Sequence, residues 1–288
     1  IMVPDWVFAY VINDAKNVIS GAPFDSGEDS PIFADLKKKV EALDISEAEK
    51  ADLIARGEEA LVDSLAPAYR KLIAEMERQQ KIAVDGDGVW RFKDGAAYYA
   101  ERLKNYTTTD LTAGQIHQIG LDNVARIHGE MRKIMAKVGF EGSLQDFFQH
   151  LRTSDQYFYK TREAYLADAD AKIAAMEKAL PGFFNTLPKA PLTVKPVEAF
   201  REKSAGKAFY QRPAPDGSRP GTYYVNLYNL KDMSKTELEA LAYHEALPGH
   251  HLQLAIQTEL GGLPPFRQFG GITAYSEGWG LYSEELGK

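Results

Sequence analysis

The sequence contains no cysteine among its 288 residues. Disulfide bonds and thiolate ligands are therefore excluded, and any metal ion must be bound by histidine and carboxylate side chains. Long apolar runs are also lacking, and no stretch approaches the roughly 20 residues that a membrane-spanning helix needs. Basic blocks are absent too: 34 Lys and Arg stand against 41 Asp and Glu, a net charge of −7. This balance argues against nucleic acid as a partner.

Most of the chain has the periodicity of amphipathic helices, so the predicted fold class is mainly α. The hydrophobic content of 44% and the length are ample for a deep core. Ser46 with Glu49, and Thr112 with Gln115, have the spacing of helix-capping boxes. Helices are predicted over residues 6–19, 31–43, 46–80 with a kink near Pro67, 95–103, 112–137, 143–151 and 154–180.

The character of the chain changes after residue 190. Residues 191–197 are predicted to be extended, and residues 206–212 and 221–227 form two strands joined by a Pro- and Gly-rich connection, which is typical of a hairpin. We therefore predict a helical scaffold over residues 1–190. Residues 191–288 would supply a small β-hairpin or sheet and the helices that follow it in the same domain.

A dense group of histidines and glutamates follows the hairpin. Three of the six histidines, His244, His250 and His251, fall within eight residues, and Glu245 stands beside the first. Imidazole and carboxylate groups at this density indicate a metal site. The usual zinc motif, His-Glu-x-x-His, places two histidines on one helical face, but here Pro248 occupies the second histidine's position.

A regular helix cannot form this site. His250 would point about 120° away from His244, and His251 would lie about 10 Å further along the axis. Pro248 also interrupts the helix, because it has no N–H and its ring clashes with the preceding turn. We predict a bulged or broken turn, with Gly249 absorbing the bend and His250 as the second ligand.

The third ligand is predicted to come from the helix that follows. Glu277, Leu281 and Glu284 are spaced to face one way, and Glu277 is the preferred ligand. Three protein ligands leave the fourth position of one zinc ion for water, which is the catalytic arrangement. Glu245 would then act as the general base that deprotonates this water.

The hairpin before the histidines would form one wall of the active-site cleft. Arg219, Tyr223 and Tyr224 are the side chains expected near a substrate, with Arg219 and Tyr223 as candidate oxyanion donors. For each of the three, a purely structural role in closing the hairpin is an equal alternative. An exposed strand there could pair with an extended peptide through backbone hydrogen bonds.

Taken together, the chain resembles the bacterial family labelled domain of unknown function 885. The most specific matches are His244-Glu-Ala-Leu-Pro-Gly-His-His-Leu-Gln253 and Tyr275-Ser-Glu-Gly-Trp-Gly-Leu-Tyr282, supported by Tyr106-Thr-Thr-Thr-Asp110 and Asp216-Gly-Ser-Arg-Pro-Gly221. This family is similar to helical zinc peptidases of the gluzincin type. The resemblance implies a multi-helix zinc-peptidase architecture with one Zn²⁺ at His244, His250 and Glu277, and Glu245 as base.

Several expectations stay open after this resemblance. Because two residues are inserted relative to His-Glu-x-x-His, either His250 or His251 could be the second ligand.

Members of the family are about twice this length, so a missing C-terminal half is expected. The resemblance favours the periplasm or cell envelope, although the cytoplasm stays open, and no signal segment is visible. The sequence does not indicate an oligomeric state.

Three functions are weighed. The first is a zinc peptidase acting on peptides. The second keeps the metal but cleaves a non-peptide amide or an ester. The third is a non-catalytic helical binding protein whose histidines and glutamates form a satisfied polar core. Glu245→Gln separates the first and second from the third, because only an enzyme would lose turnover while keeping its metal and fold.

Overall fold

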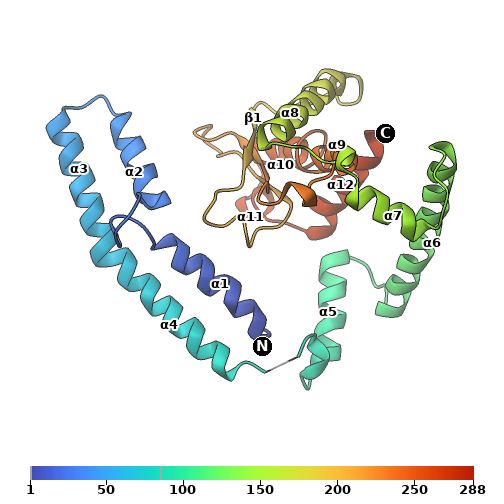
Figure 1. The fold of residues 1–288 in the computed structure, drawn as a ribbon, viewed down its shortest axis with the longest axis horizontal. Helices are drawn as coiled ribbons and strands as arrows, with labels where there is room; N and C mark the ends of the chain where they lie inside the picture. The colour runs from blue at the N-terminus through green and yellow to red at the C-terminus, as the bar shows by residue number, and fades with distance from the viewer. Residues whose placement is uncertain (1, 85) are drawn as a thin grey trace. The chain divides into compact units, whose positions relative to one another are not determined.

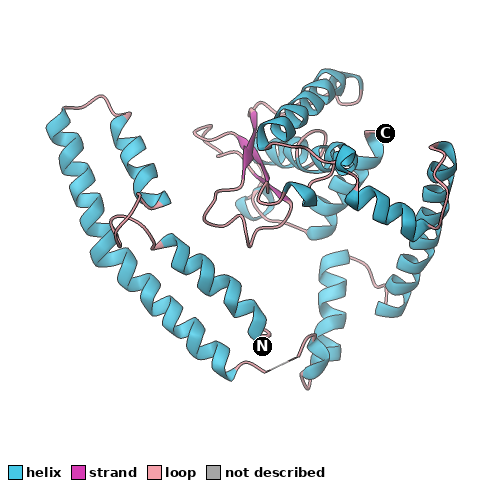
Figure 2. Ribbon diagram, in the orientation of Figure 1, coloured by secondary structure: helices cyan, strands magenta, loops and turns pink. Residues whose placement is uncertain are grey.

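The computed structural model describes residues 2–84 and 86–288. It is mainly helical with one small sheet (Figures 1 and 2), which confirms the predicted fold class. Contacts divide the chain into two compact units, one of residues 1–91 and 198–204 and the other of residues 92–197 and 205–288. No helix within the described residues has both the length and the apolar character needed to cross a membrane.

The first unit consists of two helix pairs. Its helices are α1 (Asp5–Val18), α2 (Pro31–Glu41), α3 (Glu47–Ala60) and α4 (Ala66–Ile82), followed by a short 3₁₀ turn (Val89–Arg91). α1 packs against α4 and α2 packs against α3 (Figure 1). Phe8, Ile12 and Ala15 of α1 meet Ile73 of α4 in a small apolar core.

The kink expected near Pro67 takes the form of a π-helical turn. Residues Leu61–Leu65 form this turn between α3 and α4, and Pro67 lies in the first turn of α4. Proline cannot donate the backbone hydrogen bond that a continuous α-helix requires, so the hydrogen-bond ladder is interrupted just before it. The capping box between Ser46 and Glu49 is formed as predicted at the start of α3.

The second unit contains most of the helices. They are α5 (Gly95–Thr107), α6 (Ala113–Lys137), α7 (Leu144–Thr153), α8 (Arg162–Ala179), α9 (Lys235–Glu245), α10 (His250–Glu259), α11 (Pro265–Gln268) and α12 (Thr273–Leu286). The predicted capping box between Thr112 and Gln115 begins α6.

The predicted helix over residues 154–180 begins later than expected. Asp155–Tyr157 is a 3₁₀ turn, and α8 starts only at Arg162. Phe158 is buried and extended and forms a β-bridge with Ser234. Thr161 caps α8 by accepting a hydrogen bond from the N–H of Ala164, which fixes the start of the helix.

A three-stranded sheet lies in the second unit (Figure 2). Its strands are β1 (Leu192–Pro196), β2 (Ala208–Gln211) and β3 (Gly221–Val225), in the order β1-β3-β2. β2 and β3 form the predicted antiparallel hairpin, with Tyr210 opposite Tyr223. The extended segment after residue 190 joins the sheet as β1, parallel to β3. β3 is therefore central and β2 is an edge strand.

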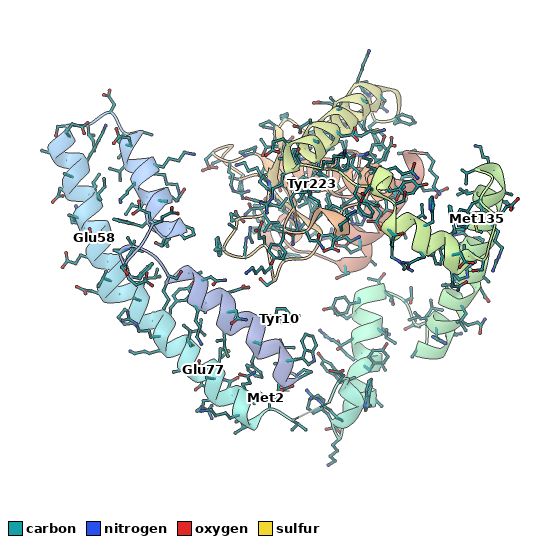
Figure 3. All side chains as sticks on the ribbon, viewed as in Figure 1. Met2, Tyr10, Glu58, Glu77, Met135 and Tyr223 are labelled. Carbon is teal, nitrogen blue, oxygen red and sulfur yellow. The ribbon has the colours of Figure 1, made fainter. Side chains whose placement is uncertain are left out.

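The core of the second unit forms between the sheet and α8, α9 and α10. Tyr165 of α8, Tyr223 of β3 and Ala242 of α9 belong to one buried cluster. Figure 3 shows Tyr223 among densely packed side chains. α8 contacts both α9 and β1, so the helices after residue 91 group with the sheet and the helices that follow it. This grouping differs from the boundary expected near residue 190, because α8 buries its apolar face on the segment that follows it.

Candidate metal centre

The helix break occurs where the sequence predicts it. α9 and α10 are separated by an irregular turn over residues 246–249. Pro248 cannot continue α9, because it has no N–H. Gly249 lets the backbone of this turn pass close to the carbonyl oxygen of His244, since a Cβ atom on residue 249 would lie 1.9 Å from that oxygen. The turn therefore brings His250 back toward His244, which a continuous helix would not do.

The turn and α12 bring the three predicted ligands together. One possible ligand atom from each of His244, His250 and Glu277 lies within 4.8 Å of the other two. The Nε2 atoms of His244 and His250 lie 3.3 Å and 3.7 Å from Oε2 of Glu277. His250 is buried, His244 is half-buried and Glu277 is exposed, so the cluster is reached from solvent on the side of the glutamate.

These residues fit a zinc ion. Two imidazole nitrogens and one carboxylate oxygen form a donor set that catalytic zinc sites use. Ligand atoms bound about 2.1 Å from a tetrahedral ion lie about 3.4 Å from one another. The observed separations of 3.3 Å and 3.7 Å between the Nε2 atoms and Oε2 of Glu277 are close to this value. The group can therefore hold one ion and leave its fourth position open.

A glycine lets α12 approach the first histidine. A Cβ atom on Gly280 would lie 2.5 Å from Cε1 of His244, so the helix backbone passes directly over the imidazole. Gly280 lies one turn after Glu277, and residues three apart share a helical face. Leu281, which is predicted to lie on the same face as Glu277, is 66% exposed. The side of α12 that faces His244 includes Gly280, because a residue with a Cβ atom at this position would clash with the imidazole.

Glu284 completes the facing side of α12. Its Oε1 lies 2.8 Å from Nδ1 of His244, so the carboxylate accepts the Nδ1–H hydrogen bond. This leaves the lone pair of Nε2 free toward Glu277. The sequence predicts that Glu284 shares a face with Glu277, but its hydrogen bond to the histidine was not foreseen.

Glu245 is a buried carboxyl group beside the ligands. Its exposed fraction is 8%. The pKa of this carboxyl group is raised to about 7, mainly by burial. The charge of His244 opposes this increase, and the charge of Glu277 adds to it. A carboxyl group that takes up a proton near neutral pH is suited to act as a general base and then as an acid.

His251 is held by the protein on both sides of its ring. Nδ1 lies 2.9 Å from the hydroxyl of Tyr210, and Nε2 lies 3.1 Å from the carbonyl oxygen of Ala190. A carbonyl can only accept, so Nε2 carries the proton and Tyr210 donates to Nδ1. Burial lowers the pKa of His251 to about 4, against opposing effects of Ala190 and Glu259. Of the two alternatives, the geometry favours His250 as the ligand.

The two predicted oxyanion donors, Arg219 and Tyr223, have opposite exposure to solvent. Arg219 lies exposed in the connection between β2 and β3, and its Nη1 donates a 2.7 Å hydrogen bond to the carbonyl oxygen of Arg212. Tyr223 is fully buried, and burial raises the pKa of its hydroxyl, with further contributions from Tyr165 and Glu245. Tyr224 stacks on Phe209 across the hairpin, with 4.8 Å between the ring centroids.

Trp279 connects α12 to the irregular turn. Its Nε1 donates a 2.9 Å hydrogen bond to the carbonyl oxygen of Pro248. Its ring contacts those of Phe184 and Tyr282 at centroid distances of 6.1 Å and 5.6 Å. The sequence identified this tryptophan only as part of a motif, since a contact across 31 residues has no local signal. The bond holds the turn against the helix that carries Glu277.

Fold and site together define a mainly helical protein with a His/Glu cluster suited to a metal ion. All of the chain, residues 1–288, matches the family described as "Bacterial protein of unknown function (DUF885)", and the chain belongs to this family. This confirms the family resemblance inferred from the motifs. The comparison with curated proteins finds no match.

A solved structure is similar to nearly the whole chain. It is that of a protein from Colwellia psychrerythraea described as a "putative lipoprotein", with a TM-score of 0.89 and 31% sequence identity. The similarity covers 99% of this chain and 49% of that one. The chain thus spans about half the length of this relative.

Proposed function

We propose that this protein is a zinc-dependent hydrolase, and specifically a metallopeptidase. The observation that supports this most directly is the convergence of His244, His250 and Glu277 within 4.8 Å, with the buried carboxyl group of Glu245 adjacent in sequence to the first ligand. Two histidines and a carboxylate would hold one Zn²⁺ and leave a position open to solvent. The bound ion would supply Lewis-acid polarisation of the scissile carbonyl group.

The chain's own residues would move the proton. Glu245 would accept a proton from the attacking water as the oxygen of that water bonds to the carbonyl carbon. The same carboxyl group would then give the proton to the leaving amine nitrogen as the C–N bond breaks. The raised pKa of Glu245 suits both steps, because neither protonation state is strongly favoured near neutral pH.

The hairpin offers a place for an extended substrate. β2 is an edge strand of the sheet, and the ring of Tyr210 in this strand lies 6.4 Å from the ring of His250. A peptide that paired with the outer edge of β2 through backbone hydrogen bonds would therefore run close to the ligand cluster. This placement supports a peptide over a small non-peptide amide or an ester.

An envelope location is proposed alongside this activity. The similar protein from Colwellia psychrerythraea is described as a "putative lipoprotein", and lipoproteins are anchored at a membrane surface. Fractionation of cells that express the native gene tests this proposal. Recovery of the protein in the envelope fraction would support it, and recovery in the cytoplasm would contradict it.

The activity is tested with the zinc-loaded chain and a panel of short peptides, non-peptide amides and esters. We expect the peptides to be cleaved by wild-type protein. Glu245→Gln should keep its zinc but lose at least 100-fold in rate, because the base is removed while the ligands remain. His244→Ala should lose both zinc and activity. Equal cleavage by wild type and Glu245→Gln would contradict the proposal. If only esters or non-peptide amides were cleaved, these would be the substrates in place of peptides.

A further inference from the structure

Gln253 has an amide whose orientation is fixed by a neighbouring helix. It lies on α10 one turn after His250, and its side chain is 8% exposed. Its Nε2 donates a 2.9 Å hydrogen bond to the carbonyl oxygen of Tyr275 in α12. Since a carbonyl can only accept, the amide nitrogen must face Tyr275 and the amide oxygen must point elsewhere.

Two buried polar atoms of α10 lack partners. Considering only the described residues, Oε1 of Gln253 and Nδ1 of His250 are both buried without a hydrogen-bond partner. Nδ1 carries the proton whenever Nε2 of His250 serves as a ligand, so it needs an acceptor. Oε1 of Gln253 can only accept, so it needs a donor. Residues three apart on a helix are neighbours, and leaving both groups unpaired would be costly.

We propose that Gln253 is the positioning residue for His250 and couples it to Glu277, an inference that rests on the proposed metal site. One water molecule would bridge the two groups, accepting the Nδ1–H of His250 and donating to Oε1 of Gln253. The Nε2 atom of Gln253 holds Tyr275, two residues before Glu277. Each histidine ligand then has its own outer acceptor, Glu284 for His244 and Gln253 for His250.

Three variants separate the contact of Gln253 with His250 from its hydrogen bond to Tyr275. Gln253→Met fills similar space and removes both hydrogen bonds. Gln253→Glu keeps an acceptor for His250 but removes the donor to Tyr275. Gln257→Met is the matched control, because Gln257 lies one turn further along α10 and its Nε2 donates instead to the carbonyl oxygen of Arg267, at 2.7 Å.

The first measurement uses metal-free protein. Nitrogen-15 NMR at pH 7.5 reports the tautomer of His250, with its signals assigned by their loss in His250→Asn. We expect the Nδ1–H tautomer in wild type, Gln253→Glu and Gln257→Met, and a mixture with the Nε2–H tautomer in Gln253→Met. Circular dichroism verifies that each variant is folded. An unchanged tautomer in Gln253→Met, or a mixture in Gln253→Glu, would overturn the proposal.

The second measurement is zinc affinity by competition with a chelator. Gln253→Met should bind zinc at least 10-fold more weakly than wild type, and Gln257→Met should match wild type. The zinc affinity of Gln253→Glu should fall between these two, because only the hydrogen bond to Tyr275 of α12 is lost. Wild-type affinity in Gln253→Met would overturn the coupling. If neither wild type nor any variant binds zinc but the tautomer changes as expected, the proposed metal site is wrong and the pairing of Gln253 with His250 is supported.

Discussion

Nδ1 of His244 lies 2.8 Å from a carboxylate oxygen of Glu284, which is 40 residues later in the chain. This contact crosses from the end of α9 to the last turns of α12 and fixes which ring nitrogen carries the proton. The lone pair of Nε2 is thereby directed toward Glu277, 3.3 Å away. The geometry of the proposed ligands therefore depends on a residue outside the His244, His250 and Glu277 cluster.

Removing this carboxylate should weaken metal binding without unfolding the protein. We expect Glu284→Ala to bind zinc about 10- to 100-fold more weakly, because His244 loses the partner that orients its ring. Chelator competition measures the affinity. Glu285→Ala is the control, since the neighbouring Glu285 pairs with Lys288 and not with the cluster. Equal affinities in the two variants would exclude a positioning role for Glu284.

The adjacent histidines should respond differently to substitution. His250→Ala should abolish zinc binding. His251→Ala should keep zinc but lose about 1–3 kcal/mol of unfolding free energy, because it leaves the Tyr210 hydroxyl and the Ala190 carbonyl without their buried partner. Elemental analysis and urea unfolding give the two readings. Zinc loss in His251→Ala with retention in His250→Ala would reverse the ligand assignment.

Trp279 should stabilise the turn that precedes α10. Trp279→Phe keeps an aromatic ring against Phe184 but removes the donor to the Pro248 carbonyl. We expect a loss of about 1 kcal/mol in unfolding free energy from the hydrogen bond, and weaker zinc binding as α12 loosens from the turn. Urea unfolding and chelator competition measure these changes. Trp90→Phe is a suitable control, because Trp90 is 79% exposed in the first unit.

Glu245 should make the metal-free protein less stable as pH rises. Its folded-state pKa is raised to about 7 by burial, so the folded chain holds the proton more tightly than the unfolded chain does. Stability is therefore lost between the unfolded pKa, about 4.5, and the folded pKa. Each pKa unit corresponds to about 1.4 kcal/mol, so wild type should lose about 2 kcal/mol relative to Glu245→Gln between pH 5 and pH 8. Urea unfolding of both proteins at the two pH values gives this difference, and a constant difference would show that burial does not perturb Glu245.

The sequence predicts the fold where the signal is local. The capping boxes at Ser46 and Thr112, the hairpin of β2 and β3, and the break at Pro248 follow from turn chemistry, capping and helical periodicity. The late start of α8 was missed, because its cause is the burial of Phe158 against a segment more than 70 residues away. β1 was predicted only as extended, since its parallel partner is not its neighbour in the chain.

The candidate site also contains residues with a local sequence signal and residues whose contacts are long-range. His244, His250 and Glu277 could be selected from residue type and spacing, and the structure brings them together. Tyr210, Trp279 and the role of Glu284 could not be, because each contact joins residues far apart in sequence. Arg219 and Tyr223 are predicted from their chemistry and from their place on the hairpin that precedes the histidines. The structure places the first in an exposed connection and the second in the core.

The proposed function requires that the His244, His250 and Glu277 cluster bind one zinc ion. Elemental analysis of protein purified without a His-tag or chelator, and incubated with zinc, tests it most directly. We expect about one zinc per chain in wild type and in the control His117→Ala, whose histidine is exposed on α6. His244→Ala should contain almost none. Zinc-free wild type, or equal zinc in His244→Ala, would contradict the claim.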